Sequence, residues 1–178
     1  MSGAQVQCFE LFNASPTINN WGGGGTPSTE EMWDKLLSAG HVIYGVASDD
    51  AHNFKGELGP FRSGPGRGWI MVKAPELTAP ALVQAIEHGD FYASIGVEIV
   101  SYEVTPDEIK LELSRNRPFE DVRYRTYFIG RQGAVLKVDE SFNPSYKFRG
   151  DELYVRVRVE NSDRMVAWTQ PVFPKSLK

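Results

Sequence analysis

The sequence predicts an α+β protein whose first part mixes strands with helices and whose second part is an antiparallel β-sandwich. Over residues 1–96, short apolar runs typical of buried strands alternate with apolar patterns of helical period. After Gly96 the apolar residues recur at every second position, and turn residues interrupt them at short intervals. We therefore expect an α/β domain over residues 1–96 and an immunoglobulin-like sandwich over residues 97–178.

The first part opens with a predicted strand, helix and strand. Residues 6–12 form one apolar run and residues 42–48 form another. Between them, Ser28 and Glu31 predict a capping box at the start of a helix, and Gly40 predicts its end. Such a βαβ unit alone leaves apolar faces and edge backbone groups in water. We expect it to pair with a second copy or to fold against the C-terminal part of its own chain.

A long loop, a strand and an extra helix complete the first part. Residues 53–68 are rich in glycine and proline, which predicts an irregular loop that is either functional or disordered. Residues 69–73 predict a strand. Pro80 marks the first turn of a helix, and Gly89 marks its end.

Seven strands are predicted for the second part. Alternation is clear in residues 155–159, where valines occupy one face and arginines the other. Four arginines, Arg123, Arg125, Arg156 and Arg158, could form a basic stripe for an acidic ligand, but we expect them simply to point into solvent. We expect Tyr154 and Trp168 to lie in the core or between domains. The predicted strands are residues 98–104, 108–113, 122–129, 134–139, 145–148, 153–160 and 165–173.

The candidate site follows the second predicted strand, where the chain reads Ser48-Asp49-Asp50-Ala51-His52. Side chains two positions apart on an extended segment share a side and lie about 6.6 Å apart. Asp50 and His52 should therefore face one site, with Asp49 turned away. A carboxylate and an imidazole suit zinc, manganese or iron, although a catalytic zinc needs about three protein ligands. These residues leave open the alternative that Asp49 and Asp50 cap a loop and that His52 is a surface histidine.

Several motifs resemble one family of metallohydrolases. Residues 33–40, followed by the segment 48–52, resemble the last metal-binding motif of the polymerase and histidinol phosphatase (PHP) superfamily. Residues 68–70, 89–94 and 167–173 resemble its CehA/McbA-like branch of metal-dependent phosphoesterases. The resemblance implies a PHP-type barrel remnant, consisting of the βαβ unit plus the extra helix, followed by the sandwich. It also implies divalent zinc, manganese or iron, and hydrolysis of small phosphate esters by metal-activated water.

The resemblance implies roles for individual residues, but the motif with which family members begin is absent from this sequence. Family members open with a His-x-His motif, whereas this chain has three histidines and no His-x-His. We therefore expect the C-terminal portion of such a protein, inactive by itself, whose partner is the missing N-terminal half or a second copy. The implied residues are Asp50 and His52 as metal ligands, Glu10 and Asp49 as neighbours of the site, and Arg62 and Arg67 as phosphate-binding groups.

Composition argues against some functions. A formal net charge of −4 argues against a surface that coats nucleic acid. No apolar stretch reaches the length of a membrane span and no signal peptide is recognisable in the chain as given, so a soluble chain is expected. A second hypothesis needs no metal, and describes a non-catalytic β-sandwich module for interaction or oligomerisation that carries a remnant of a barrel. The number of metal ligands distinguishes the two hypotheses.

Overall fold

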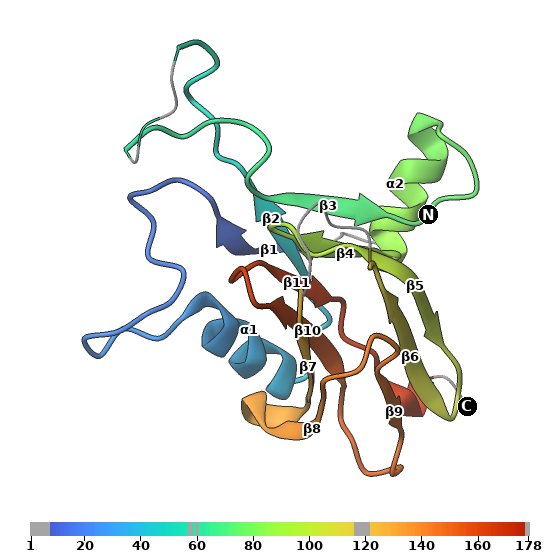
Figure 1. The fold of residues 1–178 in the computed structure, drawn as a ribbon. Helices are drawn as coiled ribbons and strands as arrows, with labels where there is room; N and C mark the ends of the chain where they lie inside the picture. Colours follow the sequence, from blue (N-terminus) through green and yellow to red (C-terminus); the bar gives the residue numbers. More distant parts are fainter. Residues whose placement is uncertain (1–7, 57–58, 60, 116–121, 177–178) are drawn as a thin grey trace.

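The computed structural model describes residues 8–56, 59, 61–115 and 122–176. Its N-terminal unit consists of β1 (Cys8–Asn13), α1 (Thr29–Ser38) and β2 (Tyr44–Ser48), and the two strands are parallel (Figure 1). The predicted capping box is confirmed, because the Glu31 backbone N–H donates to the Ser28 hydroxyl and the Ser28 N–H donates to the Glu31 carboxylate. The Thr29 hydroxyl also donates to the Leu11 carbonyl at 2.6 Å, which joins the start of the helix to β1.

Two antiparallel sheets make up most of the remaining fold, which confirms the α+β class and a β-sandwich. The larger sheet has the order β3 (Trp69–Val72), β4 (Phe91–Ser94), β11 (Val166–Thr169), β10 (Arg156–Asn161), β7 (Tyr124–Ile129) and β8 (Val135–Asp139). The smaller sheet has the order β5 (Ile99–Val104), β6 (Glu108–Leu113) and β9 (Ser145–Lys147). The remaining elements are α2 (Ala79–His88) and the short 3-10 helices η1 (Arg131–Gly133) and η2 (Pro174–Ser176).

The seven strands predicted after Gly96 are all present, most of them shorter than predicted at one or both ends. The helix predicted after Thr78 is also present, and Gly89 ends it with a φ of 76°, a conformation that glycine adopts without strain. The larger sheet takes β3 and β4 from before residue 96 and four strands from after it. Strands from both predicted domains therefore share one sheet.

Two hydrophobic cores organise these elements. The first lies between the two sheets and includes Ile109, Phe128 and Val157. The second joins the N-terminal unit to the larger sheet, and is formed by Leu11, Trp33, Leu37, Ala47, Ala93, Tyr154, Val166 and Trp168. The expectation that the βαβ unit folds against its own C-terminal part is therefore confirmed, as is the packing role of Tyr154 and Trp168.

One buried ion pair crosses the second core. The Arg156 guanidinium donates to both carboxylate oxygens of Asp34, with distances of 2.8 Å from Nε and 2.7 Å from Nη2. The Tyr154 hydroxyl donates to the same carboxylate at 2.9 Å. Arg156 was predicted to point into solvent, and this is wrong, because only 1% of its side chain is exposed. The physical reason is that α1 covers this face of β10 and places a carboxylate over the guanidinium.

The side chain of Gln170 attaches β2 to the C-terminal segment. Its amide oxygen accepts a hydrogen bond from the Gly45 N–H at 2.8 Å, and its amide nitrogen donates to the Gly45 carbonyl at 2.9 Å. The amide thus pairs with β2 as a neighbouring strand would, and it satisfies backbone groups at an edge of this strand. Neither helix of the described chain has the length and apolar character needed to cross a membrane.

Replacing Asp34 with alanine should destabilise the protein strongly, because the Arg156 charge would stay buried with only Glu30, at 3.1 Å, as a carboxylate partner. We expect the free energy of unfolding to fall by about 3 kcal/mol, measured by urea denaturation. The control Lys35→Ala removes an exposed charge from the same helix, and it should change stability by less than about 0.5 kcal/mol. Equal urea midpoints for Asp34→Ala and the unmodified protein would contradict a structural role for the pair.

Candidate functional site

The candidate site lies where β1 and β2 end side by side. Asn13 is opposite Ser48 in the strand register, and the Ala14 N–H donates to the Ser48 carbonyl at 2.9 Å. The loop between β2 and β3 leaves from this point and projects from the body of the molecule (Figure 1). The carboxyl edge of parallel strands is a common place for sites, because loops from neighbouring strands meet there.

Asp50 and His52 lie together, but not by strand geometry. β2 ends at Ser48, and Asp50 has a φ of 46°, so the chain turns instead of remaining extended. The extended geometry predicted for this segment is therefore wrong. The turn places Nδ1 of His52 2.6 Å from the Asp50 carbonyl oxygen and 3.7 Å from its carboxylate oxygen Oδ1.

This contact selects one tautomer of the neutral imidazole ring. A carbonyl oxygen only accepts hydrogen bonds, so Nδ1 of neutral His52 carries the proton and donates it. Nε2 then keeps its lone pair, which is the form that ligates a metal, and the contact at Nδ1 resembles the support given to many metal-binding histidines. The side chain of His52 is 70% exposed and that of Asp50 is 39% exposed, so solvent reaches both.

Asp49 holds the loop together. Its carboxylate accepts backbone N–H groups from Gly66 at 2.8 Å, Arg67 at 2.6 Å and Gly68 at 2.8 Å. Partial burial acts to raise the pKa of Asp49, but these three donors and the Arg67 charge outweigh it and lower the pKa. The side chain is thus ionised and occupied by loop backbone groups, which matches the loop-capping alternative for this residue.

Ser63 is the residue that sequence reasoning missed. It is buried, and its hydroxyl lies 2.5 Å from the Asp50 carbonyl and 3.0 Å from the Asp49 carbonyl. Its own carbonyl accepts the N–H groups of His52 and Asn53, and its N–H donates to the Asn53 side chain. Ser63 therefore fixes the turn that carries Asp50 and His52. Its sequence context, between an arginine and a glycine in a loop, carries no signal of this role.

Glu10 lies beside the site on β1. One of its carboxylate oxygens accepts the Ser48 hydroxyl at 2.7 Å, and the other accepts the Asn13 side-chain amide at 3.2 Å. These contacts hold Glu10 on the two strands, next to the start of the loop. Within the described ranges, no three or more His, Cys, Asp or Glu side chains come together as a group that could hold a metal ion.

Arg62 and Arg67 lie in the same loop as His52, and both are exposed. The Arg67 guanidinium donates to the Arg62 carbonyl at 2.9 Å, while the Arg67 backbone N–H binds Asp49. These contacts connect both arginines to the part of the loop that Asp49 and Ser63 hold in place.

No protein-family model, curated protein or solved structure matches the chain.

Replacing Asp49 with alanine should loosen the loop without unfolding the sheets, since its three acceptor contacts are all with loop backbone groups. We expect the amide hydrogens of residues 66–68 to exchange at least about tenfold faster, because a hydrogen bond to a charged group contributes about 1.5–3 kcal/mol. Amides of β10 and β11 should be unaffected. Asp50→Asn is the matched control, because asparagine tolerates the positive φ of this position. Equal acceleration in both variants would contradict the role of Asp49.

Proposed function

We propose that the chain is part of a metal-dependent phosphoesterase of the PHP type, in which Asp50 and His52 contribute to the metal site. The observation that carries this proposal is the geometry of the pair. An imidazole with its Nε2 lone pair available lies beside a carboxylate at the carboxyl edge of two parallel strands. The parallel β1–α1–β2 unit is consistent with a piece of an α/β barrel, and the two facing sheets are consistent with an immunoglobulin-like sandwich.

Asp50 and His52 are suitable types of metal ligand, but two side chains are fewer than a catalytic metal site needs. Carboxylate and imidazole donors suit zinc, manganese or iron. A catalytic zinc uses about three protein ligands, and the described residues bring two such side chains together at this turn. In this proposal the remaining ligands come from polypeptide beyond the described residues or from a second copy, and the chain alone is inactive.

The chain's own residues would have distinct tasks in such a site. When bound, a divalent metal supplies an activated water for attack on phosphorus. His52 would bind through Nε2, while the Asp50 carbonyl holds the ring by accepting the Nδ1 proton. Arg62 and Arg67 belong to the same loop, where a guanidinium can form paired hydrogen bonds with a small phosphorylated substrate.

A non-catalytic role is the second candidate. The observation that favours it is that the described residues contain no metal-binding group of three or more side chains. In that case the N-terminal unit is a remnant of a barrel, and the sandwich serves interaction or oligomerisation. The two candidates differ in whether His52 binds metal in preference to the other histidines.

A zinc titration followed by NMR of the histidine ring protons tests the proposal. We expect the His52 resonances to respond at lower zinc concentration than those of His41 and His88, because only His52 has a carboxylate and an orienting carbonyl beside it in the described structure. Asp50→Asn, which removes the carboxylate and tolerates the positive φ of this position, should weaken the His52 response.

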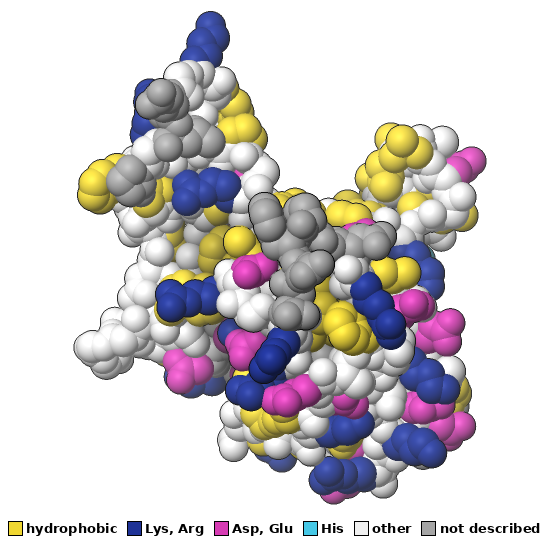
Figure 2. Space-filling view, viewed as in Figure 1, with side chains coloured by type: hydrophobic (Ala, Val, Ile, Leu, Met, Phe, Trp, Pro, Cys, Tyr) yellow, Lys and Arg dark blue, Asp and Glu magenta, His cyan; other side chains and the backbone are white. Residues whose placement is uncertain are grey.

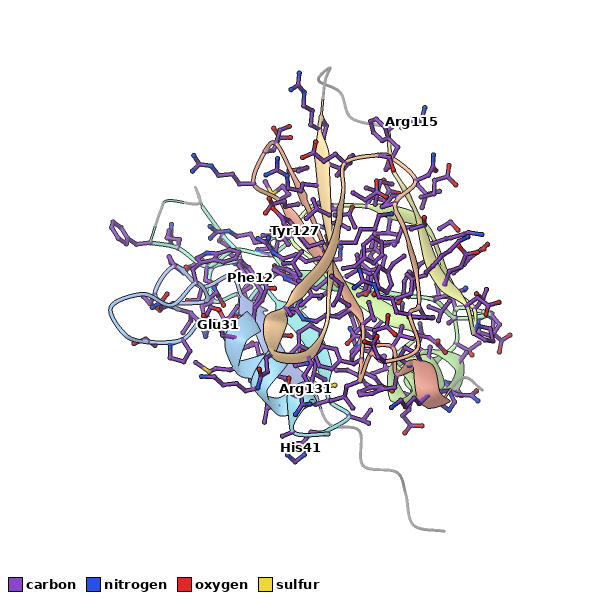
Figure 3. The ribbon with its side chains drawn as sticks, turned by 90° about the horizontal axis from the view of Figure 1, so that it is seen from below. Phe12, Glu31, His41, Arg115, Tyr127 and Arg131 are labelled. Atoms are coloured by element: carbon purple, nitrogen blue, oxygen red, sulfur yellow. The ribbon has the colours of Figure 1, made fainter. Side chains whose placement is uncertain are left out.

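His41→Ala is the matched control for this titration. His41 is exposed and lies beyond α1, before β2 begins (Figure 3). The variant should leave the His52 response unchanged. Equal responses of the three histidines, or no effect of Asp50→Asn, would contradict the metal site and favour the non-catalytic module.

A further inference from the structure

The loop between β2 and β3 exposes two phenylalanines. Phe54 is 74% exposed and Phe61 is 88% exposed, and each is followed in sequence by a cation, Lys55 or Arg62. We call these four residues the loop tip. Large exposed aromatic side chains on a projecting loop are typical of an interaction site. The base of the loop is fixed by Asp49 and Ser63, so the tip is presented on an ordered support.

A groove with complementary chemistry lies elsewhere on the molecule. It has a volume of about 570 Å³ and runs between β3, the C-terminal end of α2 and β5. Met71 and Val100 line it and are exposed, and the buried rings of Phe91 and Tyr92 form part of its wall. We call this the β5 groove. Its apolar part can take an aromatic side chain, and charged side chains lie around that part.

The charges of the two surfaces are opposite in sign. Asp90, Glu98 and Glu103 line the β5 groove, together with one cation, Lys73. Glu103 lies opposite Lys110 on β6, so Asp90 and Glu98 supply most of the excess negative charge. The segment 54–62 carries Lys55 and Arg62 against a single acid, Glu57, which leaves it positive. Opposite charges at the rim of apolar surfaces favour association and fix its orientation.

The positions of the two surfaces favour contact between two molecules. The loop and α2 both project from the same side of the body, with β3 between them (Figure 1). The space-filling view shows these two projections well separated, with hydrophobic side chains on both (Figure 2). In a two-fold dimer built on this contact, the loop of each copy meets the β5 groove of the other. Both contacts then form at once, and the assembly closes as a dimer.

We propose that the loop tip of one chain docks in the β5 groove of a second copy, and that the two copies form a reciprocal dimer. The phenylalanines enter the apolar groove, and Lys55 and Arg62 lie near Asp90 and Glu98. This inference goes beyond the proposed function and does not depend on metal binding, since the groove residues are separate from Asp50 and His52. Arg62 takes part in both proposals, and in the dimer Arg67, which is not a loop-tip residue, is the arginine that remains for phosphate.

Sedimentation equilibrium with charge-reversed variants tests the dimer. The unmodified chain should associate reversibly, and more weakly at high salt. A loop variant, Lys55→Glu with Arg62→Glu, and a groove variant, Asp90→Lys with Glu98→Lys, should each raise the dimer dissociation constant by at least about tenfold. An equimolar mixture of the two variants should associate again, because each contact in the mixed dimer joins opposite charges.

Association of the mixed variants distinguishes the reciprocal dimer from nonspecific self-association. Nonspecific self-association would not return when a loop variant is mixed with a groove variant. Arg131→Glu, an exposed charge reversal on η1, is the control and should not change association. A monomeric unmodified chain would overturn the proposal, and so would a mixture that stays monomeric while each variant is folded by circular dichroism. Binding of the monomeric chain to anionic phospholipid vesicles, lost in Phe54→Ser with Phe61→Ser, would assign the loop tip to a lipid surface instead.

Discussion

The contact on which the rest of the structure depends is the buried ion pair between Asp34 and Arg156. Removing two charges from water is costly, and the pair recovers that cost only through good geometry and further hydrogen bonds. The two-bond contact, the Tyr154 hydroxyl and the nearby Glu30 carboxylate supply these bonds, and the guanidinium carbon lies 5.1 Å from the centre of the Trp33 ring. Nη1 of Arg156 is buried without a hydrogen bond, so these contacts offset only part of the desolvation cost. Because the two hydrogen bonds form only when the carboxylate and the guanidinium are aligned, the ion pair favours one orientation of α1 on the larger sheet.

That orientation in turn positions the candidate site. The helix fixes β1 through the Thr29 hydroxyl and through packing of Leu11 against Trp33 and Leu37, and Gln170 fixes β2 through Gly45. Two parallel strands are too few to be stable by themselves. Here they persist because their inner face lies on the sandwich, so the edge that carries Asp50 and His52 has a defined place relative to the rest of the chain.

Local features of the fold could be predicted from the sequence, and features created by distant contacts could not. The capping box at Ser28, the glycine end of α2 and the alternating strands depend on neighbouring residues, and all are present. β4 was not predicted, because four buried residues are too short a run to show a period. The alternation of valine and arginine in β10 correctly placed Arg156 on the opposite face of the strand from the valines. It could not show that a helix more than a hundred residues earlier covers the arginine face. The site shows the same limit, since Asp50 and His52 were identified as a pair while the turn that joins them depends on Ser63.

The loop after β2 links the two proposals through a single physical element. Its base holds Asp50 and His52 by contacts to Asp49 and Ser63, and its tip presents Phe54 and Phe61 to a partner. A ligand at the base and a partner at the tip both act on the order of the same segment, so each would change the affinity of the other by the same factor. The tightly bonded base limits that coupling, because a segment that is already ordered has little conformational entropy left to lose. We therefore expect the dimer to form without metal, with only a small gain in stability when metal binds.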